Sequence, residues 1–262
     1  MAQLSMFDPS IDQPKTKYEG TVIYETSGNA REYRELACNL YTGCDHRCIY
    51  CYAPIVLQRD RKNFHNIVIP RVDILKKLEK DARKYSEAGE TRQVLFCFTC
   101  DPYCKADVEH QLTRKAITIC HNYGMNVSVL TKGGTRALRD IDLFTPQDSF
   151  ATTLTTLDDA ESLKWEPDAA LPAERLSTLK AFHAAGIPTW VSLEPVLDPG
   201  EVLGIIWKSH EFVDEYKVGT LNYHPHAKTI DWRKFSHDVV ALLEKLGCKY
   251  YIKNDLKKYM EG

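Results

Sequence analysis

Short apolar runs alternate with segments of helical periodicity along most of the chain from residue 36 onward. Short runs rich in β-branched and aromatic side chains are typical of strands, whereas apolar residues at helical spacing are typical of helices. An alternation of the two predicts a parallel sheet with helices packed outside it. Six strands are expected, at residues 36–41, 94–99, 126–131, 150–155, 189–193 and 216–219.

Four helices are predicted between and after these strands, and each one stops at a glycine. Asp231 can cap the fourth helix because its carboxylate can accept hydrogen bonds from the first free amide groups. The apolar faces are formed by Ile74, Leu75, Leu78, Ala82 and Tyr85 before Gly89; by Val108, Leu112, Ala116, Ile119 and Tyr123 before Gly124; by Leu176, Leu179 and Phe182 before Gly186; and by Phe235, Val239, Leu242, Leu243 and Leu246 before Gly247.

Strands that are each followed by helical segments predict an α/β fold, a partial (β/α)6 TIM-type barrel, with an open doubly wound sheet as the alternative. In both architectures the functional groups gather at the carboxyl ends of the strands. Residues 1–30 break the alternation because prolines and glycines punctuate them. We therefore expect a short N-terminal extension at residues 1–30 and one barrel domain at residues 31–262.

The composition agrees with one domain and gives no sign of export. With 262 residues and 44% hydrophobic side chains, the chain can bury one sizeable core. Its first ten residues lack the features of a signal peptide, and no apolar run is long enough to span a bilayer, so a cytoplasmic protein is expected. Nine cysteines in such a protein are more consistent with metal or redox chemistry than with disulfides.

The formal net charge is −2, so the chain lacks the general basic excess of proteins that hold duplex DNA through its phosphates. A local basic patch would still serve, and residues 59–62 and 253–258 are the candidates. Charged runs of this kind are more often solvated surface. Net charge therefore leaves a nucleic-acid partner open.

Three cysteines stand close together directly after the first predicted strand. Cys44, Cys48 and Cys51 form a Cys-x3-Cys-x2-Cys pattern on a loop at the expected functional end of the barrel. Such a loop can wrap three thiolates around a [4Fe–4S] cluster, which normally takes four protein ligands, so one iron stays open for a small molecule. The alternative is a structural zinc site with His46 as a fourth ligand, although the usual second cysteine pair is missing.

The sequence around these cysteines resembles the radical S-adenosylmethionine superfamily, whose signature is Cys-x3-Cys-x2-Cys with an aromatic residue before the last cysteine. Within the superfamily, the chain is similar to the spore photoproduct lyase branch over most of the barrel. The cysteine motif is highly specific for the superfamily, and the other matches are less specific for the branch. They lie at residues 39–44, 51–53, 98–103, 130–132, 153–156 and 192–195.

The resemblance implies roles for residues at several strand ends. The three cysteines would ligate the cluster, and Tyr50 would lie beside the adenine of S-adenosylmethionine. Lys132 would meet the carboxylate of this cofactor through a charge-assisted hydrogen bond, with an exposed turn lysine as the equal alternative. Thr153 is the candidate for the ribose hydroxyls, and its alternative is an ordinary strand threonine.

A further thiol, Cys100, is the candidate hydrogen-atom donor. Period-two alternation places Phe96, Phe98 and Cys100 on one side of the second strand. The lyases of the branch carry a donor cysteine two residues earlier, where this chain has Phe98, and this departure weakens the case for thymine-dimer repair. Cys97, Cys100 and Cys104 also have the spacing of a second metal site, but a strand would splay them apart, so free thiols are expected.

Polar residues after the last two predicted strands are candidates for contact with the substrate. Glu194 ends the fifth strand and could accept a hydrogen bond from an amine or hydroxyl, and Asn222 and His224 follow the sixth. A histidine beside Pro225 is also typical of an ordinary surface loop.

The resemblance implies an enzyme that uses a [4Fe–4S] cluster and S-adenosylmethionine to generate a 5′-deoxyadenosyl radical, with electrons from a flavodoxin- or ferredoxin-type donor. By analogy with the branch, the expected reaction is a lyase or isomerase step on a modified thymine base in DNA. The alternatives are a radical enzyme acting on a small metabolite, peptide or RNA, and a non-enzymatic iron–sulfur or zinc module. Neither the substrate nor the oligomeric state follows from the sequence.

Overall fold

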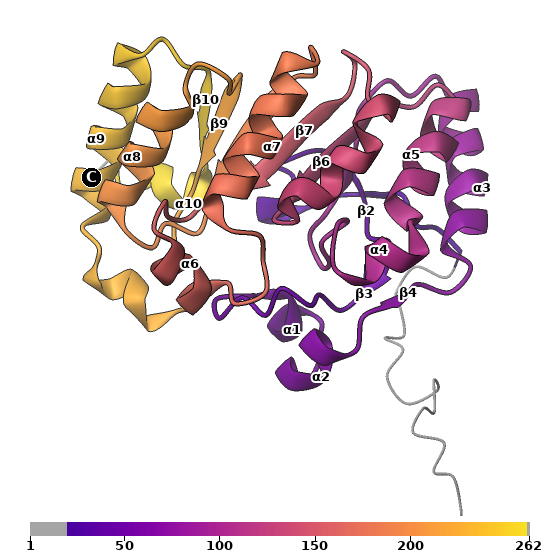
Figure 1. Cartoon of the computed structure of the whole chain (residues 1–262), viewed down its shortest axis with the longest axis horizontal. Coiled ribbons are helices and arrows are strands. Elements are labelled where there is room, and N and C mark those ends of the chain that lie inside the picture. The colour runs from indigo at the N-terminus through magenta and orange to yellow at the C-terminus, as the bar shows by residue number, and fades with distance from the viewer. Residues whose placement is uncertain (1–19, 261–262) are drawn as a thin grey trace, which may run out of the picture.

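The computed structural model describes residues 20–260, which form an open eight-stranded sheet with helices on its outer side (Figure 1). Neighbouring strands are parallel except β1 and β2, and the two edge strands β1 and β10 do not pair, so the barrel is partial as predicted. In spatial order the strands are β1 (Tyr24–Glu25), β2 (Leu36–Cys38), β5 (Val94–Phe96), β6 (Val127–Thr131), β7 (Ser149–Thr153), β8 (Thr189–Leu193), β9 (Glu215–Val218) and β10 (Tyr250–Ile252).

The six expected strands are present as β2 and β5 to β9, and they lie side by side in chain order. The sequence did not predict β10, whose three residues are too few to show an alternation. It also did not predict β1, which lies within the expected extension and pairs with β2 through Tyr24 and Ala37. Of that extension, residues 1–19 lie outside the described part of the chain.

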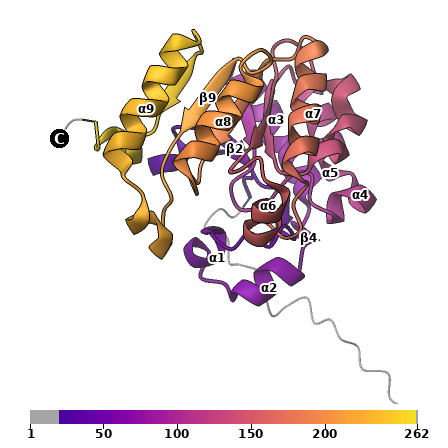
Figure 2. The same cartoon turned by 60° about the vertical axis from the view of Figure 1, so that its left-hand side comes forward.

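The four predicted helices cover the convex side of the sheet (Figures 1 and 2). Asp231 caps the last of them by accepting a hydrogen bond from the amide of Lys234, as expected. The second predicted helix is wrong at its start, because Gln111 has a φ of 50° and divides it into two helices. Within residues 20–260, no helix is both long and apolar enough to cross a membrane. The predicted helices are α3 (Ile74–Glu87), α4 (Ala106–His110) with α5 (Leu112–Asn122), α7 (Pro172–Ala184) and α9 (Trp232–Lys245).

Smaller elements connect this framework, and several of them surround the carboxyl ends of the strands (Figures 1 and 2). They include a second, two-stranded sheet that packs beside the first cysteine. The elements are η1 (Gly28–Ala30), β3 (Tyr41–Thr42), α1 (Ala53–Val56), α2 (Arg61–Asn66), β4 (Ile69–Pro70), η2 (Gly134–Leu143), α6 (Asp159–Trp165), α8 (Pro199–Ser209), η3 (Pro225–Thr229) and α10 (Asn254–Lys257).

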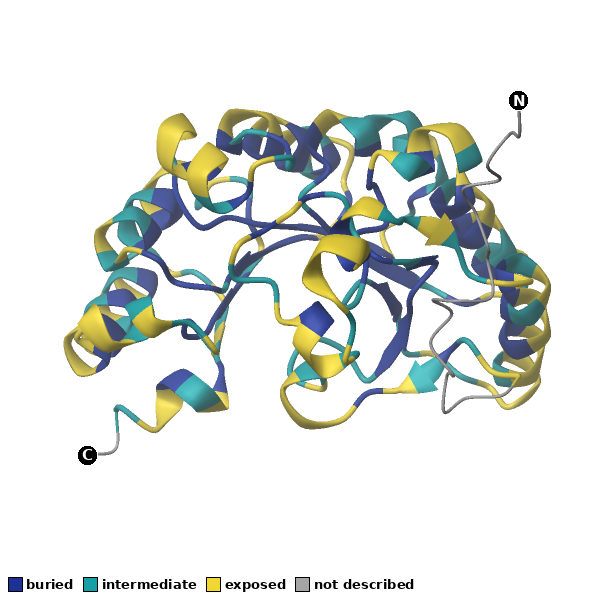
Figure 3. Ribbon diagram, turned by 90° about the horizontal axis from the view of Figure 1, so that it is seen from below, coloured by how far each residue is buried: buried dark blue, intermediate teal, exposed yellow. Residues whose placement is uncertain are grey.

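The two faces of the sheet bury different side chains. Alternate residues of the strands face the helices and form the main core, whereas the residues between them face the concave interior. The interior cluster contains Trp190 and Leu95, with Tyr33, Cys97 and Phe98 packed against it. Seen from below, the buried strands lie within an outer layer of helices whose exposed residues face solvent (Figure 3). The concave face is therefore lined by aliphatic and aromatic side chains, with the Cys97 thiol packed against them.

The second predicted strand is too long, and this changes where its side chains point. β5 ends at Phe96, and Phe98 has a φ of 95°, a conformation that no regular strand contains. Phe96 and Cys100 therefore belong to the outer core, whereas Phe98 packs against the interior cluster. The predicted alternation of Phe96, Phe98 and Cys100 on one side is wrong because the strand ends before the pattern does.

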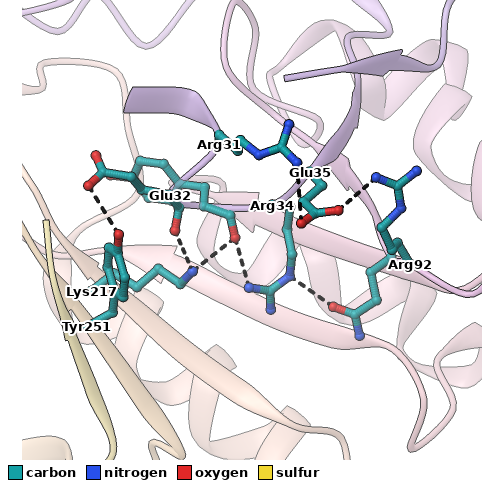
Figure 4. Close-up of a pocket in the computed structure, with 9 residues that line it drawn as sticks. Arg31, Glu32, Arg34, Glu35, Arg92, Lys217 and Tyr251 are labelled. Atoms are coloured by element: carbon teal, nitrogen blue, oxygen red, sulfur yellow. Dashed lines mark hydrogen bonds and ion pairs between the residues drawn. The ribbon is translucent and has the colours of Figure 1, made fainter. Parts of the chain in front are cut away.

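The segment that precedes β2 runs along the concave side of the sheet and contacts strands on both halves of it (Figure 4). Lys217 of β9 donates hydrogen bonds to the carbonyl oxygens of Glu32 (2.8 Å) and Tyr33 (2.9 Å), and Arg34 donates to Gln93, which precedes β5 (3.0 Å). A cavity of about 410 Å³ remains there, in which Glu35 pairs with both Arg31 and Arg92. These contacts fix the segment against the sheet.

Candidate active site

The cysteine loop leaves β3 at the carboxyl end of the barrel and is held by α2. Gly43 has a φ of 80°, and a Cβ atom there would lie 2.5 Å from the carbonyl oxygens of both Phe64 and Ile67, so only glycine fits. The next amide, that of Cys44, donates to the Phe64 oxygen at 3.2 Å, and His65 Nδ1 lies 2.8 Å from the Cys44 oxygen. The close approach at Gly43 therefore seats the first cysteine against the helix.

The three thiols of this loop are unpaired and largely shielded from water. Cys48 is buried, Cys44 and Cys51 are half-buried, and none of them forms a disulfide. Burial raises the pKa of all three thiols, that of Cys48 to about 12, and the carboxylates of Asp101 and Glu166 add to the effect at Cys44 and Cys48 respectively. Thiols with such a raised pKa stay protonated unless a metal binds them, because coordination removes the proton.

The three thiols lie on one short loop at the carboxyl end of β3. Cysteine thiolates are the usual ligands of a [4Fe–4S] cluster, which normally takes four of them. Three thiols on one loop are therefore suited to hold such a cluster with one iron left open for a small molecule.

His46 does not complete a zinc site, although the sequence allowed that reading. Its ring is buried, with Nε2 3.0 Å from Arg136 Nη2 and Nδ1 3.4 Å from Asp101 Oδ2. Burial lowers its pKa, so the neutral ring accepts a hydrogen bond from Arg136 and turns its other nitrogen toward the Asp101 carboxylate. Both nitrogens are occupied, and His46 has none left for a metal.

Asp101 joins the cysteine loop to the ends of β5 and β6, and sequence reasoning assigned it no role. It is buried and accepts hydrogen bonds from Thr131 Oγ1 (2.6 Å) and from the amides of Tyr103 (2.8 Å) and Lys132 (2.7 Å). Although burial alone would raise its pKa, His46 and these donors lower it overall, so the carboxyl is ionised. The only signal in the sequence was its position within residues 98–103.

Lys132 extends from the end of β6 toward the thiols and Tyr50. Its Nζ lies 5.8 Å from the centre of the Tyr50 ring. Burial opposes its charge, but Cys48 and Glu166 outweigh that effect and raise the pKa of the ammonium. Lys132 is therefore a fixed positive charge beside the cysteine loop rather than an exposed turn residue.

A buried ion pair links Tyr50 to Thr153, the third residue assigned to cofactor binding. Tyr50 donates its hydroxyl hydrogen bond to Glu166, which pairs with Arg175 at 2.5 Å. Arg175 in turn donates to the carbonyl oxygen of Thr153 at 3.0 Å, at the end of β7. The structure thus brings Tyr50, Lys132 and Thr153 to one region through two charged residues that the sequence did not single out.

The three cysteines after β5 lie in different surroundings. Cys100 is buried in the outer core, where its sulfur lies 3.9 Å from Asn39 Oδ1 and burial raises its pKa to about 11. Cys104 belongs to the same core, whereas Cys97 packs against the concave interior. Cys97 therefore lies on the other side of the barrel wall from Cys100 and Cys104.

Glu194 follows β8. Together with Asn222 after β9 and Lys253 after β10, it belongs to the part of the interior that we call the far wall. Its carboxylate accepts hydrogen bonds from Tyr33 (2.5 Å), Asn222 (3.3 Å) and Lys253. A Cβ atom on Gly219 would lie 2.8 Å from the Glu194 carboxyl carbon, so the glycine makes room for this group. Burial raises the pKa of Glu194, although Lys253 counteracts the effect.

Lys253 corrects one expectation, because it is only 2% exposed and cannot belong to a surface patch at residues 253–258. His224 is also separate from Glu194 and Asn222. Its ring packs 5.2 Å from that of Trp165, whose carbonyl oxygen accepts a hydrogen bond from the amide of Ile49 in the cysteine loop. The structure therefore groups two of the three predicted substrate residues and places the third beside α6.

Comparisons with known proteins include two uncharacterized relatives. An uncharacterized protein of Mycobacterium tuberculosis (strain ATCC 25618 / H37Rv) is 30% identical over 178 residues, which are 63% of this chain and 52% of the relative. An uncharacterized protein of Methanocaldococcus jannaschii is 25% identical over 191 residues, 70% of this chain and 69% of the relative. The chain thus spans about half the length of the mycobacterial relative.

Two solved structures share the fold. A spore photoproduct lyase variant with bound AdoMet and dinucleoside spore photoproduct has a TM-score of 0.68 at 16% identity, covering 87% of this chain and 78% of that one. SuiB of Streptococcus suis bound to S-adenosylmethionine has a TM-score of 0.64 at 13% identity, covering 86% and 52%. At such low identity these likenesses show the fold alone.

The chain also matches the radical SAM superfamily over residues 38–213, from β2 to the segment before β9. This range contains the cysteine loop and the strand ends that carry Lys132, Thr153 and Glu194. Because the match covers more than half of the chain, the protein belongs to the radical S-adenosylmethionine superfamily, whose cofactors are a [4Fe–4S] cluster and S-adenosylmethionine.

Proposed function

We propose that Cys44, Cys48 and Cys51 ligate the cluster and that Lys132, Tyr50 and Thr153 hold S-adenosylmethionine. The observation that carries this proposal is a loop of three unpaired, shielded thiols with the Lys132 ammonium beside it. When bound, the cluster and S-adenosylmethionine supply a 5′-deoxyadenosyl radical, which is the cofactors' own chemistry.

Lys132 is suited to bind the carboxylate of S-adenosylmethionine. Its side chain makes no hydrogen bond within the described part of the chain, so its donors are available to a ligand. A charge-assisted hydrogen bond between ammonium and carboxylate is roughly twice as strong as a neutral one, and partial burial strengthens it further. The Glu166–Arg175 pair holds Tyr50 and the end of β7 in register with this lysine.

The proposed reaction is a lyase or isomerase step on a modified thymine base in DNA. Two observations support it: the similarity of the sequence motifs to the spore photoproduct lyase branch, and the partly buried rings of Tyr33 and Phe98 in the interior, against which a planar base could pack. Glu194 and Asn222 would then contact polar groups of the base. Because Lys253 is buried, it cannot contact the phosphates of DNA, so the binding of DNA would depend on other residues.

The sequence suggested Cys100 as hydrogen-atom donor, and the burial of its thiol in the outer core favours Cys97 in its place. Cys97 packs against the interior, where a product radical would form. In the proposed step, the S–H bond of Cys97 breaks homolytically while a C–H bond forms on the product, so that the unpaired electron moves to sulfur. Cys97→Ala should change the product or stop turnover without stopping cleavage of S-adenosylmethionine, and Cys100→Ala should change neither.

The cofactor assignment is tested by anaerobic reconstitution followed by measurement of 5′-deoxyadenosine. The protein should form it with a reductant, and Cys44→Ala, Cys48→Ala and Cys51→Ala should each abolish it. Cys248→Ala is the matched control, because Cys248 lies in the turn between α9 and β10. Full activity in any one of the three ligand variants would contradict the assignment.

A peptide substrate is the second candidate. It is favoured by the likeness to SuiB, which has been solved with its precursor peptide SuiA and matches this chain with a TM-score of 0.61. Oligonucleotides with defined thymine lesions and short peptides can be incubated with the reduced enzyme and analysed by mass spectrometry. Products from the oligonucleotides alone, with salt-dependent binding, would support the DNA proposal, and products from peptides alone would overturn it.

A further inference from the structure

Arg61 lies at the first position of α2 and turns its guanidinium group toward the cysteine loop. Nη1 donates to the carbonyl oxygens of Cys48 (3.3 Å) and Ile49 (3.2 Å), and Nη2 donates to that of Cys51 (2.7 Å). The sequence had placed residues 59–62 in a candidate patch for nucleic acid. In the structure, Arg61 instead donates its hydrogen bonds to the loop that carries the three thiols.

From this geometry we infer that Arg61 is a positioning residue for the iron–sulfur cluster: its guanidinium fixes the backbone between the second and third ligands and places a positive charge beside them. The inference rests on the proposed assignment of Cys44, Cys48 and Cys51 as ligands. It adds a residue outside the cysteine motif whose contacts hold that motif in one conformation.

The contacts of Arg61 require a guanidinium group rather than any cation. Three carbonyl oxygens in one turn of chain need several donors in a fixed, planar arrangement, which arginine has and lysine lacks. Cys51 also closes a turn by donating its amide to the Cys48 oxygen at 3.1 Å, so this oxygen accepts two hydrogen bonds. Removal of the guanidinium leaves the Ile49 carbonyl without its donor and frees the turn to move.

The rest of α2 is built to hold Arg61 in this position. Asp60 caps the helix by accepting a hydrogen bond from the Asn63 amide at 2.8 Å, which fixes the backbone on either side of Arg61. At the other end of the helix, Phe64 and His65 contact the backbone of Cys44. The short helix therefore contacts the backbone of all three proposed ligands, and Arg61 reaches two of them.

The charge of Arg61 has a second effect, on reduction. A cluster gains one negative charge when it takes up an electron, and a nearby positive charge stabilises the reduced form by Coulomb attraction. Hydrogen bonds and charge around a cluster are known determinants of its potential. Loss of Arg61 should therefore shift the midpoint potential of the cluster to a more negative value, whereas a residue that only stabilised the fold would not shift it.

The inference is tested with Arg61→Gln and Arg61→Lys in the full chain, reconstituted anaerobically. Lys62→Gln is the matched control, because Lys62 is the exposed neighbour in α2 and makes no hydrogen bond to the loop within the described residues. The measurements are iron and sulfide per chain, the rate at which a chelator removes the iron, and the midpoint potential from an EPR-monitored titration. Circular dichroism and thermal unfolding of the metal-free proteins check that each variant folds.

We expect Arg61→Gln to lose iron to the chelator on the order of tenfold faster than the wild type and to have a more negative midpoint potential. Arg61→Lys should have a midpoint potential close to that of the wild type, because lysine keeps the positive charge. It should still lose iron faster than the wild type, because lysine lacks the planar set of donors. Lys62→Gln should resemble the wild type in both. Wild-type values in Arg61→Gln, with iron still lost in Cys48→Ala, would overturn the inference while leaving the proposed function intact; a wild type that binds no cluster would overturn the proposed function itself.

Discussion

The two walls of the barrel interior differ in how their polar groups are satisfied. On the cysteine side, three thiols lie unpaired beside Lys132, whose ammonium makes no hydrogen bond within residues 20–260. On the far side, Glu194 already accepts hydrogen bonds from Tyr33, Asn222 and Lys253. Burial of unsatisfied groups costs free energy, so the first wall is suited to gain stability from a bound cofactor, whereas the second is complete without one.

The largest effect is expected when one thiol is removed from the cysteine side. We expect Cys48→Ala to lose essentially all bound iron, since the two remaining thiolates cannot replace the third ligand. The free energy of unfolding of the metal-free protein should change little by contrast, because the Cys48 thiol makes no hydrogen bond within residues 20–260. Iron analysis after reconstitution, with Cys248→Ala alongside, checks this. Stoichiometric iron in Cys48→Ala would show that Cys48 is not a ligand.

Arg175→Met tests whether the cysteine side also depends on a preformed charge pair. Arg175 is 1% exposed, and its loss would leave Glu166 buried without a counter-charge, so we expect the free energy of unfolding to fall by about 3–5 kcal/mol. Chemical denaturation of the metal-free protein measures the change. Arg233→Met, on the exposed face of α9, is the control and should be close to neutral. An equal effect in both variants would remove the special role of the pair.

Lys253→Met applies the same change to the far wall. Glu194 would lose the ammonium but keep Tyr33 and Asn222, so we expect a smaller loss of about 2–3 kcal/mol. The variant should still bind iron, because the cysteine loop does not contact Lys253. Lys257→Met, at an exposed position of α10, serves as the control. Loss of iron in Lys253→Met would contradict the separation of the two walls.

The smallest expected effect is a dependence of stability on pH at Lys217. Burial lowers the pKa of its ammonium to about 8, whereas the unfolded chain has a lysine pKa of roughly 10.4. Between these two pH values the unfolded state binds more protons than the folded state, so the stability of the fold increases with pH. Below about pH 8 the lysine is charged in both states, and the full cost of burying its charge remains. The gain should be of the order of 1 kcal/mol from pH 8 to 9.

Lys217→Met should remove this dependence, because the methyl thioether does not titrate. Denaturation of both proteins at several pH values between 7 and 10 measures the difference. The wild type should approach the variant in stability as the pH rises. A difference that stays constant over this range would mean that the ammonium keeps its charge when buried.

The sequence predicted those parts of the molecule that depend on local pattern. The six strands alternate with helices in chain order, and the three cysteines stand within eight residues, so no distant contact was needed to recognise either. The roles of Lys132 and Thr153 were predicted from the family resemblance and stay predictions. Their positions at the ends of β6 and β7 followed from the strand pattern.

The missed features depend on pairs that are distant in sequence. Lys253 was placed in an exposed tail because its partner, Glu194, lies 59 residues earlier, and β10, which buries it, is too short to show a pattern. Glu166 is likewise separated from Tyr50 by 116 residues. The end of β5 was missed for another reason, since the φ of 95° at Phe98 interrupts an alternation that the side chains alone would continue.

The open sheet has one more consequence, for contacts between molecules. Unpaired edge strands can recruit the edge of another chain, and a barrel that does not close always keeps two of them. Here the edges are β1, with two residues, and β10, with three, so each offers few free backbone groups for intermolecular pairing. A short border of this kind lets the sheet stay open around a catalytic centre at little risk of aggregation through strand addition.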